Sequence, residues 1–151
     1  MASSRALFGA SSIWGSYDRL VADGRLSEGE VFGRIGEEGF ERLVRAFYAQ
    51  VPHDDILGAM YPRDDLKGAE QRLRDFLVYR FGGPARYIET RGHPRLGMRH
   101  HSFRLDQAAR DRWVALMERA LDTTALPEDA DVVLRGFLRD TATFLINQRP
   151  E

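Results

Sequence analysis

The apolar residues of this chain recur at helical spacing over most of its length. From Phe40 to Val51 they fall three or four positions apart, a period that places them on one face of a helix. Pro52 ends that helix because it has no N–H group to donate. Similar stripes run over 66–81, 113–121 and 134–145. The pattern therefore predicts four substantial helices.

The termini of these helices carry recognisable signals. Asp64 or Asp65 can cap the second long helix, and the run FGGP from Phe81 ends it, since glycine accepts the left-handed conformation and proline prevents continuation. Pro127 opens the last helix. Ser27 and Glu30 fit a capping box, which predicts a short first helix that ends at Gly36.

The remaining segments show weaker patterns. Residues 84–96 are polar and irregular and predict a loop, and a short piece with apolar flanks follows from Met98 to Phe103. No stretch alternates as a strand would, so the fold class is all-α. We expect one domain over residues 27–151 and an N-terminal extension over 1–26. Phe8 and Trp14 stand out in that extension as docking points.

Composition narrows the function. The chain has 151 residues, of which 43% are hydrophobic, and a net charge of −1. That balance does not favour nucleic acid or an anionic membrane as a partner. The absence of cysteine excludes disulfides, thiolate metal sites and cysteine nucleophiles. No apolar run approaches the roughly 20 residues that span a bilayer, so a cytoplasmic protein is expected.

The histidines are the most informative residues, because no GxSxG, phosphate-binding or HExxH motif occurs. His53 and His93 are expected in loops. His100 and His101 are neighbours, so in a helix they would point about 100° apart. One imidazole could face inward, but spacing alone does not choose between them. Near apolar residues a histidine is more often structural than a metal ligand.

Three aromatic residues with polar atoms fall at positions that suit a pocket. Tyr48 and Trp113 lie on apolar stripes, where a buried hydroxyl or indole N–H needs a partner. Tyr61 precedes Pro62 in a turn. Each of them, considered alone, is more often part of a core than of a ligand site.

Five segments together carry a more specific signal. Their order and spacing resemble the second group of truncated haemoglobins over roughly residues 27–147. The segments are FYAQV from Phe47, MYPRDDLKGAEQRLRDFL from Met60, FGGP from Phe81, RGHPRLGMRHHSFR from Arg91 and RDRW from Arg110. The resemblance implies a globin-like, truncated two-over-two sandwich, with the helices called B and E over those called G and H.

The resemblance also implies a site. Haem b would be the cofactor, with His100 as the ligand of its iron and His101 as an additional histidine. Tyr48, Tyr61 and Trp113 would stabilise the bound gas. The positions that would contact the cofactor are Ala69, Arg72, Leu73, Phe76, Leu77, Tyr87, Arg99 and Phe103. The chain departs from the family pattern at Gly36-Glu37, where the family has a glycine pair, and at Phe81, where a tryptophan is common.

The ligands that the resemblance implies are O2, CO, NO or peroxide. Donors aimed at bound O2 would each contribute roughly 1.5–3 kcal/mol. Tight binding suits redox chemistry, such as conversion of NO to nitrate with the help of a reductase, better than O2 delivery. Three interpretations remain open: an O2 carrier, store or sensor; a haem enzyme that acts as an NO dioxygenase or peroxidase; and a haem-free helical protein. A homodimer is also an expectation.

Overall fold

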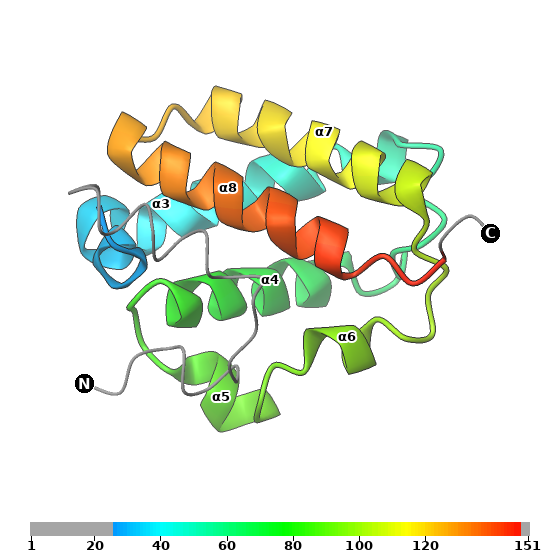
Figure 1. The fold of residues 1–151 in the computed structure, drawn as a ribbon, viewed down its shortest axis with the longest axis horizontal. Coiled ribbons are helices and arrows are strands. Elements are labelled where there is room, and N and C mark those ends of the chain that lie inside the picture. Colours follow the sequence, from blue (N-terminus) through cyan, green and yellow to red (C-terminus); the bar gives the residue numbers. More distant parts are fainter. Residues whose placement is uncertain (1–25, 149–151) are drawn as a thin grey trace.

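The computed structural model describes residues 26–148, and within that range it contains helices and no strand (Figure 1). The expected docking points Phe8 and Trp14, like nearly all of the expected extension, lie outside the described residues. The elements are η2 (Glu28–Glu30), α3 (Val31–Tyr48), η3 (Val51–His53), α4 (Leu66–Arg80), α5 (Arg86–Arg91), α6 (Leu96–Arg99), α7 (Gln107–Thr124) and α8 (Glu128–Phe144). None of the helices in this range has the length and apolar character to cross a membrane.

The four long helices form two packed pairs. Helix α3 packs against both α4 and α7, and α8 lies along α7 (Figure 1). The interior between them is filled by the predicted stripes, with Phe40, Phe47, Leu77 and Phe137 all fully buried. The prediction of an all-α, two-over-two arrangement is confirmed, and so are the four long helices found from periodicity.

Local signals act at the predicted ends. The Ser27 N–H donates to the Glu30 carboxylate over 3.1 Å, as the capping box requires. Gly36 has φ 68° and ψ 177°, which interrupts α3 where the first short helix was expected to end. Asp65 is the N-cap residue of α4, but its carboxylate makes no cap hydrogen bond and accepts from Arg72 instead, over 3.0 Å.

The expected loop over residues 84–96 is wrong in part, because α5 occupies Arg86–Arg91. This helix has six residues, too few for an apolar stripe to show in the sequence. Tyr87 anchors it, with 4% of its surface exposed and its ring 5.5 Å from that of Phe76. Arg86 pairs with Glu37, which ties α5 to α3.

The end of α4 contains a buried charge that the hydrophobic pattern did not predict. Arg80 is 3% exposed and pairs with Glu28 of η2. Its guanidinium carbon also lies 4.9 Å from the ring centre of Phe137. An arginine inside a core is stable only when its charge is paired, so this ion pair joins the start of the described chain to the helical body.

Candidate functional site

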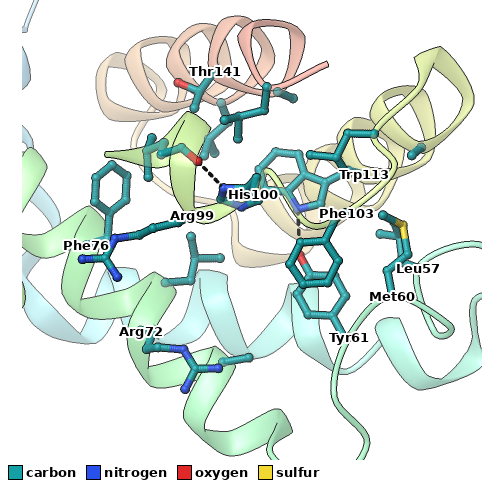
Figure 2. Close-up of a pocket in the computed structure, with 18 of the residues that line it drawn as sticks. Leu57, Met60, Tyr61, Arg72, Phe76, Arg99, His100, Phe103, Trp113 and Thr141 are labelled. Carbon is teal, nitrogen blue, oxygen red and sulfur yellow. Dashed lines mark hydrogen bonds between the residues drawn. The ribbon is translucent and has the colours of Figure 1, made fainter. Parts of the chain in front are cut away.

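The structure places all the predicted site residues around one pocket of about 330 Å³ (Figure 2). The pocket lies among α4, α5, α6, α7 and α8, with α3 contributing Tyr48. The predicted residues that line it are Tyr48, Tyr61, Ala69, Arg72, Leu73, Phe76, Leu77, Tyr87, Arg99, His100, Phe103 and Trp113. Residues separated by up to half of the chain are therefore brought together, which spacing alone could not establish.

His100 is the histidine that lines the pocket, whereas its neighbour His101 is exposed and does not. His100 follows the last residue of α6, and its Nδ1 lies 2.7 Å from the Leu96 carbonyl oxygen. A carbonyl can only accept, so Nδ1 donates its proton there, and the neutral form of the ring has its lone pair on Nε2. That arrangement leaves Nε2 available to bind a metal and fixes the orientation of the ring.

The backbone around His100 is held by the C-terminal segment. The side-chain amide of Asn147 donates to the Phe103 carbonyl over 2.8 Å and to the His100 carbonyl over 3.3 Å. In return, the Leu105 N–H donates to the Asn147 side chain over 2.9 Å. These bonds set the position of His100 relative to α8, although His100 lies in no long helix.

The polar aromatic side chains form a connected group elsewhere in the pocket lining. The Trp113 indole N–H donates to the Tyr61 hydroxyl over 3.2 Å (Figure 2). The Tyr48 ring packs edge-on against that of Tyr61, with the ring centres 5.5 Å apart. Burial raises the pKa of both tyrosines, so both hydroxyls remain protonated. Since the Tyr61 oxygen accepts the indole N–H, which can only donate, its own proton is left to donate.

Packing holds this polar group in place. The Phe47 ring centre lies 5.1 Å from Tyr48 and 5.3 Å from Trp113, and the rings of Tyr48 and Tyr61 are 5.5 Å apart at an interplanar angle of 87°. Edge-to-face contacts of this kind stabilise aromatic clusters. The donors are therefore fixed before any ligand arrives.

Arginine side chains add positive charge to a mostly apolar lining. Arg72 and Arg99 belong to the predicted site, and Arg91 and Arg110 line the pocket as well. Arg99 donates to the carbonyls of Arg91 and Pro94 over 2.7 Å each and to that of His93 over 3.2 Å. It therefore also orders the segment that precedes α6, a role that the sequence did not reveal.

Several lining residues were not predicted. They come from the turn after α3, from the region where α7 begins, and from α8 and the residue after it: Leu57, Met60, Leu105, Ala109, Phe137, Leu138, Thr141, Ala142 and Leu145. The α8 stripe was visible as periodicity, but nothing in it indicated a pocket. Thr141 is notable because its buried hydroxyl has no hydrogen-bond partner in the described part of the chain.

The donor set in the described chain suits one kind of metal site. No group of three or more His, Cys, Asp or Glu side chains in residues 26–148 could hold an ion alone. A single imidazole in an apolar pocket fits a metal whose other ligands come from a flat organic ring. Comparison with known proteins agrees, since the family described as "Bacterial-like globin" matches residues 30–146. The chain belongs to the bacterial-like globins.

Comparison with individual relatives assigns this globin to a narrower group. It is 35% identical over 114 residues to the group 2 truncated hemoglobin YjbI of Bacillus subtilis, covering 76% of this chain and 86% of the relative. It is 33% identical over 124 residues to group 2 truncated hemoglobin 3-1 of Lotus japonicus, covering 80% and 74%. The predicted membership of the second group of truncated haemoglobins is confirmed.

Solved structures agree with the fold. A thermostable hemoglobin from Thermobifida fusca is 45% identical to this globin with a TM-score of 0.76, covering 80% of this chain and 98% of that one. The hemoglobin of Chloroflexus aurantiacus is 39% identical with the same TM-score, covering 78% and 98%. Membership of the globins implies a haem cofactor and a small gaseous ligand such as O2.

Proposed function

We propose that this globin holds haem b through His100 and binds O2, with CO and NO as further ligands, beside the hydroxyl of Tyr61. One observation carries the proposal: an imidazole with a free Nε2 and a preformed group of hydrogen-bond donors line the same apolar pocket. We assign the globin domain to residues 27–151.

The residues present fit the cofactor. The lining is rich in apolar side chains such as Leu73, Phe76 and Leu77, which suit a flat hydrophobic ring. Arg72 and Arg99 supply positive charge for its carboxylates. Bound haem supplies an iron with a coordination position open to a small ligand.

The role of the donor group follows from its hydrogen bonds. Trp113 donates to the oxygen of Tyr61, so the Tyr61 proton is not used in that bond and is available to the gas. Cooperative chains of this kind strengthen the final donor. A charge-assisted hydrogen bond to bound O2 contributes roughly 1.5–3 kcal/mol. O2 that is bound this strongly is released slowly. Slow release favours redox chemistry, such as conversion of NO to nitrate, over O2 delivery.

One similar solved structure supports the proposal of tight O2 binding. A truncated haemoglobin of Bacillus subtilis, described as oxygen-avid, is 33% identical to this globin with a TM-score of 0.74. The pocket of this chain carries the donors that such avidity requires. We therefore extend tight O2 binding to it as part of the proposal.

The test replaces each of the two adjacent histidines. Wild type supplied with hemin should show the absorption spectrum of a histidine-bound haem. His100→Gly should lose that spectrum and regain it when imidazole is added, because free imidazole can occupy the vacated position. His101→Gly is the matched control and should behave as wild type. Failure of the wild type to bind hemin, or loss of the spectrum in His101→Gly alone, would contradict the proposal.

A further inference from the structure

The wall of the pocket that carries His100 has an unbalanced charge. The segment from Arg91 to Arg104, called here the arginine segment, contains four arginines and no Asp or Glu, whereas the whole chain has a net charge of −1. It includes α6 and contributes Arg91, Leu96, Arg99, His100 and Phe103 to the pocket lining. Positive charge is therefore concentrated next to the proposed iron ligand.

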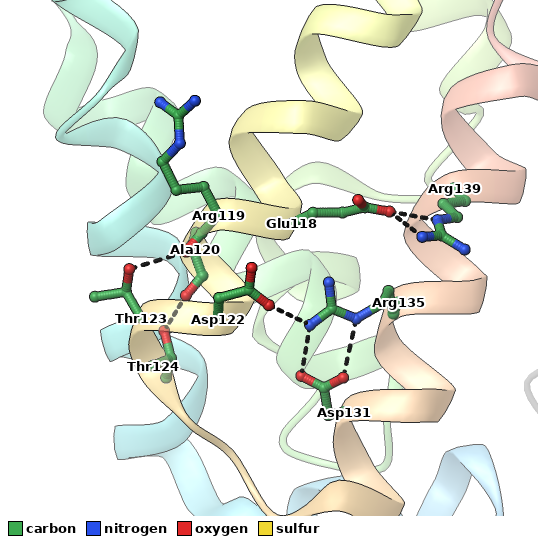
Figure 3. Close-up of polar contacts among 9 residues, drawn as sticks. All are labelled: Glu118, Arg119, Ala120, Asp122, Thr123, Thr124, Asp131, Arg135 and Arg139. Atoms are coloured by element: carbon green, nitrogen blue, oxygen red, sulfur yellow. Dashed lines mark hydrogen bonds and ion pairs between the residues drawn. The ribbon is translucent and has the colours of Figure 1, made fainter.

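The arginine segment also differs from other arginine-rich parts of the molecule in its pairing. On α7 and α8, Arg135 bonds to Asp122 and Asp131, and Arg139 bonds to Glu118 (Figure 3). The arginines of the arginine segment form no ion pair with any carboxylate of the described residues 26–148. Arg91, Arg95 and Arg104 are exposed. Their charge is available to a partner.

The arginine segment also exposes large apolar side chains. Met98 is 63% exposed and is one of the few large apolar residues that the described chain leaves at its surface, and Phe103, which also lines the pocket, is 41% exposed. Arginine, methionine and aromatic residues are the types enriched at protein–protein interfaces. Helix α6 has only four residues, so it cannot form the long amphipathic face that binds a membrane surface.

Hydrogen bonds already order the arginine segment before any partner binds. Arg99 bonds to three carbonyls within it, and Asn147 bonds to the carbonyls of His100 and Phe103. A preformed surface loses little conformational entropy on binding. A rigid, positively charged surface with exposed apolar side chains is complementary to the surface of a folded acidic protein.

We propose that the arginine segment docks an acidic one-electron carrier protein, with a flavin or an iron–sulfur centre, that reduces the haem iron. The proposal rests on the proposed function. With haem held by His100, the reduced centre of the partner would lose one electron and the ferric iron would gain it and become ferrous, and no bond would form or break. Docking at this wall would place the donor beside the segment that contributes His100 to the pocket lining.

The test measures binding of the full chain, loaded with hemin, to an acidic plant-type two-iron, two-sulfur ferredoxin. The variant Arg95→Glu/Arg104→Glu reverses two charges of the segment at residues that do not line the pocket. The control Arg63→Glu/Lys67→Glu makes the same change of net charge at exposed positions near the start of α4. At low salt the Kd should rise at least about tenfold in the first variant and much less in the control. At about 0.5 M salt the difference should disappear.

Three results would overturn the docking proposal: equal losses in the two variants, no binding of ferredoxin by wild type, or binding of anionic phospholipid vesicles without binding of ferredoxin. Basic cytochrome c should not bind wild type at low salt. If the double variant does not fold, Arg104→Glu and Lys67→Glu form a smaller matched pair. The haem absorption band is recorded for every sample, so failure to take up haem, which contradicts the proposed function, is distinguished from failure to dock.

Discussion

The two sides of the pocket are stabilised in different ways. Tyr48 and Trp113 belong to the long helices α3 and α7 and surround Phe47, which is completely buried. His100 follows a helix of four residues, in a segment where Met98 is 63% exposed. The donor side is thus part of the hydrophobic core, whereas the His100 side is held by hydrogen bonds from a few polar side chains.

This difference indicates which side depends on the cofactor. Regions with few buried apolar contacts open at a lower free-energy cost than the core. A ligand that binds only the folded form stabilises that form. We therefore expect haem to stabilise the His100 side more than the donor side, which is already fixed by packing.

The strongest test of the donor side removes its hydroxyl. Tyr61→Phe should increase the rate of O2 release from the ferrous protein about 10- to 100-fold, because it removes a hydroxyl that accepts from Trp113 and keeps its own proton for the gas. Trp113→Phe should increase the rate at least about tenfold but less than Tyr61→Phe. Stopped-flow measurement of O2 dissociation checks both.

The matched control for these variants is Tyr79→Phe, which removes a tyrosine hydroxyl that does not line the pocket. Its O2 release should equal that of wild type. Unchanged release in Tyr61→Phe would remove Tyr61 from its assigned role, and a larger effect in Trp113→Phe would make the indole the direct donor.

The His100 side is tested at Arg99. Arg99→Leu removes hydrogen bonds to three carbonyls and should lower the free energy of local opening over residues 91–100 by about 1–3 kcal/mol. Amide hydrogen exchange of that segment should accelerate, while exchange in α3 stays constant.

The conservative variant Arg99→Lys separates two roles of this residue. A lysine keeps the charge but lacks the planar group that reaches several acceptors at once. Faster exchange in both variants supports the ordering role. Amide exchange in Arg99→Lys at the wild-type rate would mean that the positive charge alone keeps the segment ordered. A contact between that charge and a haem carboxylate would have this effect.

The smallest expected effect concerns a polar contact that supports the donor side. Asp54 accepts from the Leu57 N–H over 2.8 Å and pairs with Arg112 of α7. Burial alone would raise its pKa, but the Leu57 N–H and the Arg112 guanidinium outweigh that effect and hold the pKa below 3.8. A lowered pKa in the folded state stabilises the protein at neutral pH, and this contribution is lost as the pH falls through the folded-state pKa.

Asp54→Asn should accordingly lower the free energy of unfolding by about 0.5–1 kcal/mol at pH 7. The difference from wild type should shrink as the pH falls from the unfolded-state pKa toward the lower folded-state pKa, because the wild-type carboxylate then takes up a proton. Urea denaturation at pH 7 and pH 3 measures it. A difference that is the same at both pH values would assign the effect to packing.

The sequence predicted the four long helices, which bury apolar stripes of several turns, and missed the short helix α5, which has no such stripe. Helices α3, α4, α7 and α8 have enough turns for periodicity to show, whereas α5 has six residues and depends on the packing of Tyr87 against Phe76. The pattern also did not reveal that Arg80 is buried, because its partner Glu28 lies far away in the chain.

The site residues were predicted from resemblance, and their roles stay predictions. Spacing could not choose between His100 and His101, because adjacent residues differ only in direction. The choice depends on the path of the backbone after α6, which is set by tertiary hydrogen bonds from Asn147. The contacts that connect Tyr48, Tyr61 and Trp113 likewise join three separate parts of the chain.

The contact at Gly82 has a practical consequence for fusion proteins. Gly82 has φ 101°, and a side chain there would begin 2.2 Å from the Gly29 carbonyl oxygen. The Phe32 N–H also bonds to the Phe81 carbonyl over 3.0 Å. Backbone therefore touches backbone where η2 meets the end of α4, with no space for rearrangement. A reporter or carrier protein joined ahead of this globin should have its junction before Ser27, since a junction inside η2 would displace that contact.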